Sequence, residues 1–193
     1  MAKVATQAFE QHTRSMEFVR QTALVVGASL FIGLCARLTL PLPFTPAPLT
    51  LSNFAVLAVG VTLGARRGFA ALMLYLTEGA MGLPVFAPSP LGGGIAQILG
   101  PTGGFLMAYP FVAFVAGWIY EHSPRRFGWA ALSGFVAEIV LFAGGLGWLF
   151  ALTHSFSQAI KWGLYWFLFA EVIKILMAAA IAVRWHHRST ARS

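Results

Sequence analysis

The stretch Phe127–Phe150 reads FGWAALSGFVAEIVLFAGGLGWLF and contains one charged residue, Glu138. A helix crosses the hydrocarbon core of a membrane with about 20 mostly apolar residues, so this stretch predicts a membrane-spanning helix. The rest of the chain has the same character, because 58% of its 193 residues are hydrophobic and 10% are charged. A soluble domain is about one quarter charged. We therefore expect an all-α integral membrane protein, built as one compact domain in the lipid bilayer.

Five further helices are expected around this span, which makes six transmembrane helices. Their predicted ranges are Thr22–Leu40, Leu51–Leu63, Phe69–Leu83, Phe105–Tyr120 and Ile160–Val183. Four prolines stop any helix within residues 40–50. Residues 84–104 are apolar but rich in Pro and Gly, which predicts a re-entrant or lid-like loop beside a binding cavity. The expected division is a polar tail at 1–20, a substrate-binding unit at 21–184 and a basic tail at 185–193.

The basic residues predict how the chain is oriented. With six spans, ten of the thirteen Lys and Arg residues lie on one side, namely Lys3, Arg14, Arg20, Arg66, Arg67, Arg125, Arg126, Arg184, Arg188 and Arg192. Cytoplasmic loops carry an excess of such residues, so both termini are expected in the cytoplasm. The formal charge of +7 then reflects membrane orientation, and no nucleic-acid partner is expected. The first 20 residues lack the apolar region of a removable signal peptide.

Several chemistries lack the residues that they need. None of the three lysines stands in a phosphate-binding loop, so the chain is not expected to hydrolyse ATP itself. The single cysteine, Cys35, excludes an internal disulfide. The five histidines form no pair with metal-ligand spacing. We expect no metal, no cofactor and no enzymatic activity, and the alternative is a membrane-embedded enzyme that uses Glu138 or Glu171 as acid and base.

Two ionisable residues stand near the middle of the last apolar span. Glu171 and Lys174 follow the aromatic run Tyr165–Phe169, and their spacing places both on one face of a helix. An ionised group at this depth costs at least ~2.5 kcal/mol and is a candidate for function. The pair therefore predicts a polar ligand site with aromatic walls, and the alternative is an ion pair that only holds helices together.

Other residues give weaker signals. Glu78 and Glu138 are carboxyl groups in apolar spans, and each is a site residue or a packing residue. Arg37 lies near the outer end of the first helix, where it either anchors at the interface or meets an anionic ligand. Small residues recur four apart in the pairs Ala23 and Gly27, Ser29 and Gly33, and Gly60 and Gly64. Such pairs allow close helix contact, within the chain or with a partner.

Several segments resemble, in order, the signatures of one family. They are PLPFTPAPLTL at 41–51, FAVL at 54–57, GARRG at 64–68, GLPVFA at 82–87, GPTGGF at 100–105 and EVIK at 171–174. This pattern resembles the BioY family, the biotin-binding S components of energy-coupling-factor (ECF) transporters, over about residues 20–185. The resemblance implies the six-helix S-component fold, with an outward-facing cavity capped by the loops at 40–50 and 84–104. It also implies biotin uptake across the bacterial cytoplasmic membrane, driven by a transmembrane coupling subunit and two ATPase subunits.

The resemblance also implies roles for particular residues. Glu171 and Lys174 are expected to bind the ureido group of biotin, with neutral hydrogen bonds from Asn53 and from the backbone at Gly93. Apolar walls are expected from Phe86, Tyr109 and Trp166, a contact to the biotin carboxylate from Arg37, and coupling-subunit contacts from Ala23 and Gly27. The family usually has Asp at position 171 and Gln at position 52, where this chain has Glu and Ser. These departures leave another vitamin as the alternative ligand.

Overall fold

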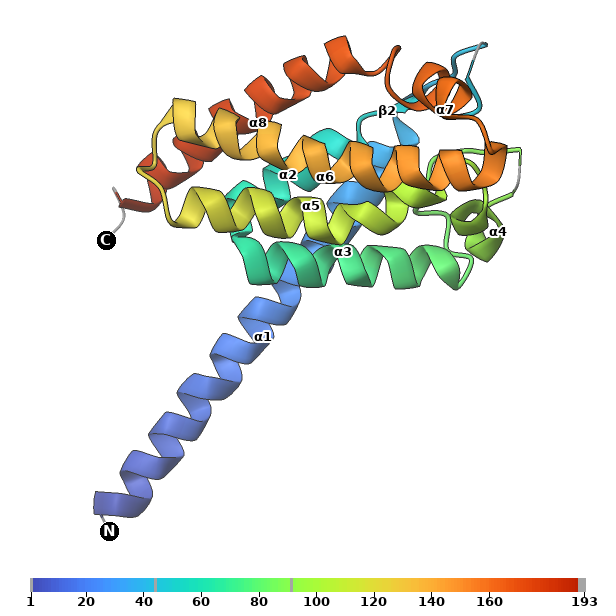
Figure 1. Ribbon diagram of the computed structural model, residues 1–193. Coiled ribbons are helices and arrows are strands. Elements are labelled where there is room, and N and C mark those ends of the chain that lie inside the picture. Colours follow the sequence, from blue (N-terminus) through green and yellow to red (C-terminus); the bar gives the residue numbers. More distant parts are fainter. Residues whose placement is uncertain (1, 44, 91, 191–193) are drawn as a thin grey trace.

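Six long helices form the body of the described chain, and shorter elements gather at one end of them (Figure 1). The long helices are α1 (Ala2–Arg37), α2 (Ser52–Leu63), α3 (Ala65–Ala80), α5 (Gly103–Glu121), α6 (Phe127–Thr153) and α8 (Leu168–Thr190). The shorter elements are strands β1 (Thr39–Leu40) and β2 (Leu49–Thr50) and helices α4 (Gly94–Leu99) and α7 (Phe156–Gly163). This computed structural model describes residues 2–43, 45–90 and 92–190, and the side chains of residues 14–43, 45–90 and 92–186.

Helix α2 is the central helix of the bundle. Every residue from Ser52 to Val61 is buried, and α1, α3, α5 and α8 pack around the helix. A helix that is apolar on all sides is stable only where other elements cover it. The polar Ser52 and Asn53 stand in its first turn, so the packing of α2 carries both into the interior.

Small residues allow the close crossing of α2 and α5. A Cβ atom at Gly60 would lie 2.6 Å from the Ala113 carbonyl oxygen, and one at Gly117 would lie 2.6 Å from the Gly60 carbonyl oxygen. Gly60 therefore serves helix contact within the chain. In contrast, a Cβ atom at Gly27 would have no heavy atom within 4 Å. Gly27 thus lies on the outer surface of α1, whereas Gly60 lies in a helix contact within the bundle.

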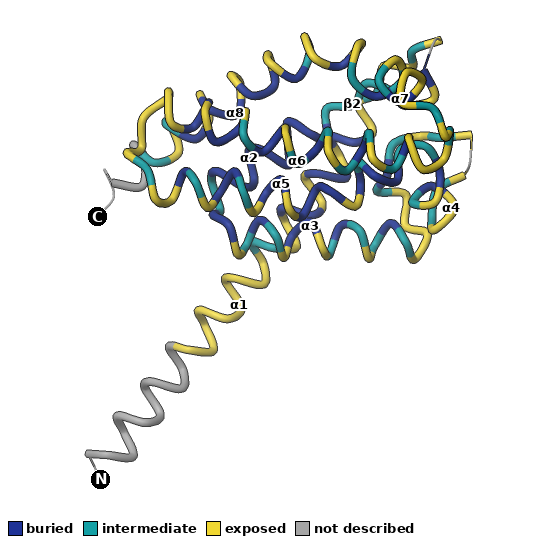
Figure 2. Tube along the Cα trace, in the orientation of Figure 1, coloured by how far each residue is buried: buried dark blue, intermediate teal, exposed yellow. Residues whose placement is uncertain are grey.

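Helix α1 is longer than expected. The sequence predicts a polar tail and a helix from Thr22, but α1 begins at Ala2 and ends at Arg37. Residues 2–26 contain neither Pro nor Gly, so nothing interrupts the helix once it forms. Glu17 supports it by accepting a hydrogen bond from Gln21 at 3.0 Å and pairing with Arg20 at 3.6 Å. Residues 14–23 of this helix are exposed (Figure 2).

The expected helix at 160–183 is instead two helices. Helices α7 and α8 meet at an angle of 48°, separated by a turn at residues 164–167. The Trp162 carbonyl accepts a hydrogen bond from the Thr45 hydroxyl at 2.7 Å, which gives that carbonyl a partner outside the helix. Three consecutive aromatic residues in the turn are also weaker helix formers than Leu or Ala. Helix α8 then continues to Thr190, through the segment that the sequence predicts to be a polar tail.

The two Pro- and Gly-rich segments form the end of the bundle where the hairpin lies. The described residues of the segment at 40–50 are free of helix as expected, and its ends form an antiparallel hairpin in which Thr39 pairs with Thr50 and Leu40 with Leu49. The segment at 84–104 differs from expectation, since it contains the short helix α4. Gly92, Gly93 and Gly94 precede α4 with φ angles of 79°, 91° and 66°, a region that favours glycine. These glycines therefore allow the turn into α4.

Three described helical segments are long and apolar enough to cross a membrane: Arg14–Arg37, α5 and α6. Helices α7 and α8 taken together as one bent span give a fourth. Helices α2 and α3 have 12 and 16 residues, fewer than the about 20 of a full span. Length and composition thus support three or four of the six expected spans.

Basic residues gather at the end opposite the hairpin. The α2–α3 junction, the α5–α6 junction and the C-terminal part of α8 lie there together (Figure 1). Arg125 donates a hydrogen bond from Nη1 to Nδ1 of His186 at 3.2 Å, and Arg67 borders the same cavity. This arrangement agrees with the one-sided charge distribution predicted above. Lys3, Arg188 and Arg192 lie outside the residues whose side chains are described.

Candidate ligand-binding site

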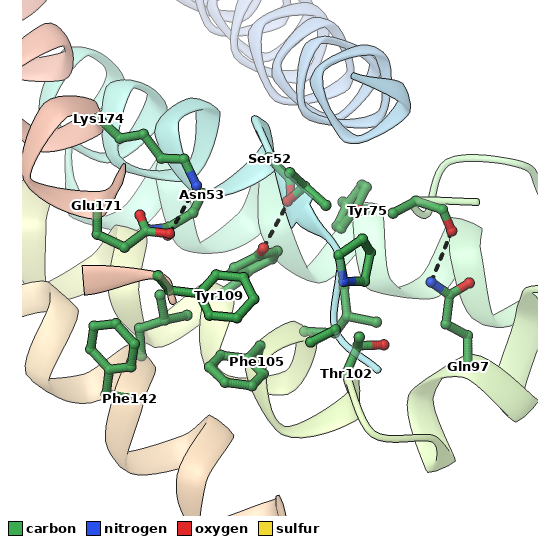
Figure 3. Close-up of a pocket in the computed structure, with 17 residues that line it drawn as sticks. Ser52, Asn53, Tyr75, Gln97, Thr102, Phe105, Tyr109, Phe142, Glu171 and Lys174 are labelled. Atoms are coloured by element: carbon green, nitrogen blue, oxygen red, sulfur yellow. Dashed lines mark hydrogen bonds and ion pairs between the residues drawn. The ribbon is translucent and has the colours of Figure 1, made fainter. Parts of the chain in front are cut away.

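A pocket lies beside the first turn of α2, between the long helices and the hairpin end (Figure 3). Its polar lining residues are Thr50, Ser52, Asn53, Tyr75, Gln97, Thr102, Tyr109, Glu171 and Lys174. Its apolar lining includes Phe105, Leu106, Leu141, Phe142 and Phe167. Apolar walls with a few fixed polar groups are typical of sites for small molecules.

Glu171 and Lys174 form an ion pair at the α8 side of this pocket. The Lys174 Nζ atom lies 2.8 Å from Oε1 of Glu171, and the two residues are 6% and 4% exposed. The prediction that both lie on one face of a helix is confirmed. A buried ion pair is weak evidence for stability, because the loss of hydration offsets most of the attraction. Its position in the wall of a pocket favours a role in binding.

Asn53 joins this ion pair to a second carboxyl group. Its Nδ2 atom lies 2.6 Å from Oε2 of Glu171 and 2.6 Å from Oε1 of Glu138. The three residues come from α2, α8 and α6, and Asn53 is 118 residues from Glu171 and 85 from Glu138. All three are buried. Glu138 is therefore part of a polar chain that ends at the pocket.

Hydroxyl groups line the pocket next to this chain. Ser52 and Tyr109 are joined by a hydrogen bond of 3.0 Å, and Ser52 and Thr50 by one of 2.5 Å (Figure 3). The Tyr109 ring thus stands in the pocket wall, as the sequence analysis expects of an apolar wall residue. Serine at position 52 therefore makes two polar contacts beside the pocket.

Two polar groups that the sequence analysis missed lie on the α3 and α4 side. Gln97 donates from Nε2 to the Ala87 carbonyl at 2.9 Å. Its Oε1 and the Tyr75 hydroxyl are both buried, with no hydrogen-bond partner in the described chain. Buried polar groups are normally paired, so these two atoms are open to a ligand or water. Gln97 is the one amide in the apolar run Gly94–Leu99. This isolated polar residue was the feature of the sequence that could have indicated a pocket residue here.

Two of the expected wall residues lie outside the pocket lining. Trp166 is 45% exposed, and its neighbour Phe167 faces the pocket instead, because the turn between α7 and α8 changes which side chain points inward. Phe86 is buried, but its ring packs edge-on against Tyr75 at a centroid distance of 5.3 Å. Phe86 therefore supports a lining residue rather than lining the pocket itself.

Arg37 and Gly93 also lie outside the lining. Arg37 is exposed, and its Nη1 donates to the Phe86 carbonyl at 3.5 Å. This contact joins α1 to the 84–104 loop, and the predicted contact of Arg37 with a ligand carboxylate stays a prediction. Gly93 is half-buried beside the pocket, and a Cβ atom there would lie 4.0 Å from Oε1 of Gln97. The described geometry supports Asn53, Tyr109, Glu171 and Lys174 as pocket residues.

Other residues singled out from the sequence are placed elsewhere. Glu78 accepts a hydrogen bond from Ser29 and joins α3 to α1, away from the pocket lining. Ala23 and Gly27 are exposed on α1. Among the described side chains, no three His, Cys, Asp or Glu residues form a group that fits a metal ion.

A bundle of long apolar helices with a buried ion pair in the wall of a pocket defines a membrane protein whose interior offers both polar and apolar contacts. The family model described as the BioY family matches residues 5–191. The "Biotin transporter BioY" of Thermotoga maritima is 37% identical over 143 residues, which are 74% of this chain and 83% of that protein. The "Probable biotin transporter BioY" of Pyrococcus horikoshii is 37% identical over 139 residues, 72% of this chain and 80% of that protein.

A solved structure gives the same result. The S-component for biotin from an ECF-type ABC transporter matches with a TM-score of 0.78 and 25% sequence identity, covering 89% of this chain and 93% of that chain. The chain belongs to the BioY family, and its fold is the S-component fold.

Proposed function

We infer that the protein captures biotin in this pocket and takes it up across the cytoplasmic membrane as the S component of an ECF transporter. The observation that carries this proposal is the buried Glu171–Lys174 pair in the pocket wall of a BioY family member. The relatives cited above are named as a biotin transporter and a probable biotin transporter.

The chemistry of biotin matches the pocket. Its ureido group has two N–H donors and one carbonyl acceptor, and its ring and valeryl chain are apolar. Glu171 provides an acceptor and Lys174 a donor, and hydrogen bonds to charged groups are the stronger ones. Phe105, Phe142 and Phe167 provide apolar surface. We propose that the ureido group binds at the ion pair and that the apolar parts lie along these rings.

The proposal is tested by binding of labelled biotin to the purified protein, in competition with a panel of other vitamins. We expect unlabelled biotin to displace the label and the other vitamins to leave it bound. Displacement by a different vitamin at lower concentration would favour the alternative ligand. Absence of biotin binding in a folded sample would contradict the proposal.

The orientation in the membrane is part of the same proposal. We propose six spans in a multi-pass protein of the bacterial cytoplasmic membrane, with residues 21–184 as the substrate-binding unit and the short helices α2 and α3 as two of the spans. The end that carries Arg66, Arg67 and Arg125 faces the cytoplasm, because positive residues are retained there. The hairpin end and its pocket then face outward.

We propose that α1 contacts the transmembrane coupling subunit, which acts with two ATPase subunits. Ala23 and Gly27 are exposed, and no side chain covers Gly27. This surface is therefore free for close contact with a second helix.

Gly27→Leu is expected to lower biotin uptake at least several-fold in cells that contain the ECF subunits, because the larger side chain keeps a partner helix at a distance. Biotin binding to the purified variant should match the wild type, since the pocket lies on other helices. Uptake assays and binding assays on the same variant check this. Gly147→Leu is the control, because Gly147 is also open on its helix but lies on α6. Loss of binding together with uptake would place Gly27 in the packing of the fold instead.

A further inference from the structure

We propose that Glu138 is a positioning residue that orients Asn53, so that the Asn53 carbonyl oxygen accepts an N–H from the ligand's ureido group. This inference rests on the proposed function and assigns a role to a carboxyl group outside the pocket lining. It also changes the expected role of Asn53 from a general polar contact to a hydrogen-bond acceptor.

The orientation of the Asn53 amide follows from its two partners. Its Nδ2 atom lies 2.6 Å from a carboxyl oxygen of Glu138 and 2.6 Å from one of Glu171. An amide nitrogen has two N–H donors, and a carboxyl group offers an accepting oxygen in either protonation state. Both donors are therefore used within the protein. The reversed amide would place its carbonyl oxygen against the Glu171 carboxylate, which is unfavourable.

This orientation leaves the Asn53 carbonyl oxygen for the ligand. The oxygen is buried and has no hydrogen-bond partner in the described chain, and Asn53 is among the pocket-lining residues (Figure 3). A buried acceptor without a partner costs free energy until a donor reaches it. A ligand N–H in the pocket is such a donor.

Together with the ion pair, this oxygen completes a set that matches a urea. The two N–H groups of a urea need two acceptors, which Asn53 and Glu171 supply. The urea carbonyl needs a donor, and Lys174 has three N–H groups, of which the contact with Glu171 uses one. The set offers two acceptors and a donor on one side of the pocket. A carboxylate, which has acceptors only, fits this side poorly.

Glu138 contacts Asn53 from outside the pocket and influences the set through this contact. It borders a groove between α6 and the α7–α8 turn, with Ile139, Leu164 and Leu168, and is absent from the pocket lining. Asn53 is its hydrogen-bond partner in the described chain, and the other Glu138 carboxyl oxygen has none. Without Glu138, one Asn53 N–H loses its partner and Glu171 alone holds the amide, which then turns more easily about its Cβ–Cγ bond. Glu138 thus helps to fix the direction of the Asn53 carbonyl oxygen, although Glu138 itself does not contact the ligand.

The test measures dissociation constants for biotin and for two biotin derivatives, each methylated on one ureido nitrogen. The proteins are the wild type, Glu138→Ala, Glu138→Gln, Asn53→Ala and the double variant Glu138→Ala/Asn53→Ala. Glu78→Ala is the matched control, because Glu78 is also a carboxyl group bonded within the helices but lies away from the pocket. We expect Glu78→Ala to bind biotin as the wild type does.

We expect Glu138→Ala and Asn53→Ala each to weaken biotin binding about tenfold, the scale of one hydrogen bond. The double variant should be no weaker than either single variant, since residues that act through one contact are not additive. Glu138→Gln should retain more affinity than Glu138→Ala, because its carbonyl still accepts from Asn53. One methylated derivative should bind the wild type and Asn53→Ala equally, since it lacks the N–H that Asn53 receives.

Other outcomes would overturn the inference. Wild-type affinity for biotin in both Glu138 variants would show that Glu138 does not act on the site. Additive losses in the double variant would show that Glu138 acts by a route other than Asn53. Dissociation constants are compared for folded protein, so a lower stability of the fold does not by itself change this result. Failure of the wild-type protein to bind biotin is a different result, because it contradicts the proposed function itself.

Discussion

Lys174→Ala is expected to abolish or greatly weaken biotin binding while the protein still inserts and folds. The change removes a donor from the pocket and leaves Glu171 buried without its charged partner, which lies at 2.8 Å in the wild type. Truncating one member of a buried, hydrogen-bonded charge pair at an interface costs about 2–5 kcal/mol. This corresponds to a loss of affinity from roughly 30-fold to several thousand-fold. Labelled-biotin binding to the purified variant measures the effect.

Glu171→Ala should have a comparable effect, because it removes the acceptor and leaves the ammonium group of Lys174 unpaired. Lys161→Ala is the matched control, since Lys161 is an exposed lysine on α7 and does not line the pocket. It should bind biotin like the wild type. If both Lys174→Ala and Glu171→Ala kept wild-type affinity, the ion pair would only hold the fold together, and the ligand site would lie elsewhere.

Gly104→Ala is expected to destabilise the fold strongly. A Cβ atom at Gly104 would lie 2.3 Å from Cβ of Trp148 and 2.5 Å from the Gly144 carbonyl oxygen, so α5 and α6 would have to separate. Forcing atoms into a packed core costs about 1–3 kcal/mol and occasionally more, and contacts with backbone leave little room to adjust. We expect a loss of about 3 kcal/mol and a melting temperature lower by about 10 °C. Thermal unfolding in detergent measures the change.

Gly147→Ala is the control for this prediction. It makes the same substitution in the facing helix, but a Cβ atom at Gly147 has no heavy atom within 4 Å. Alanine in an open helical position is favoured over glycine by roughly 0.5–1 kcal/mol, so this variant should be as stable as the wild type or slightly more stable. Equal melting temperatures for the two variants would contradict the close crossing of α5 and α6.

Close contacts also explain why the GPTGGF segment has glycine at positions 103 and 104. Trp148 donates from Nε1 to the Gly100 carbonyl at 2.9 Å, so the residue that packs on Gly104 also holds the start of the segment. A Cβ atom at Gly103 would lie 1.7 Å from the Ile98 carbonyl oxygen. The two glycines therefore allow α5 to begin directly beside α4 and α6, and this position brings Phe105 and Tyr109 into the pocket wall.

The class of protein was predictable from the sequence because it depends on local properties. Apolar runs predict membrane helices wherever they fold, and Pro and Gly end them by local geometry. The i, i+3 spacing of Glu171 and Lys174 predicts a shared face for the same reason, since it depends on one turn of helix. The end of α1 followed by an extended segment, and the bounds of α5, likewise agree closely with the predicted elements.

The composition of the site depended on contacts between distant parts of the chain. Asn53 stands between Glu138 and Glu171, which are 85 and 118 residues away, and no local pattern relates these positions. Gln97 and Tyr75 join the pocket only because α3 and α4 fold against α5. Phe167 replaces Trp166 in the wall because Thr45, from the Pro-rich loop, takes the Trp162 carbonyl. The sequence thus determined that the chain is a membrane helix bundle and that Glu171 and Lys174 share a helix face. Tertiary packing decided which other side chains meet that pair, because each of those contacts joins helices whose relative positions no single segment specifies.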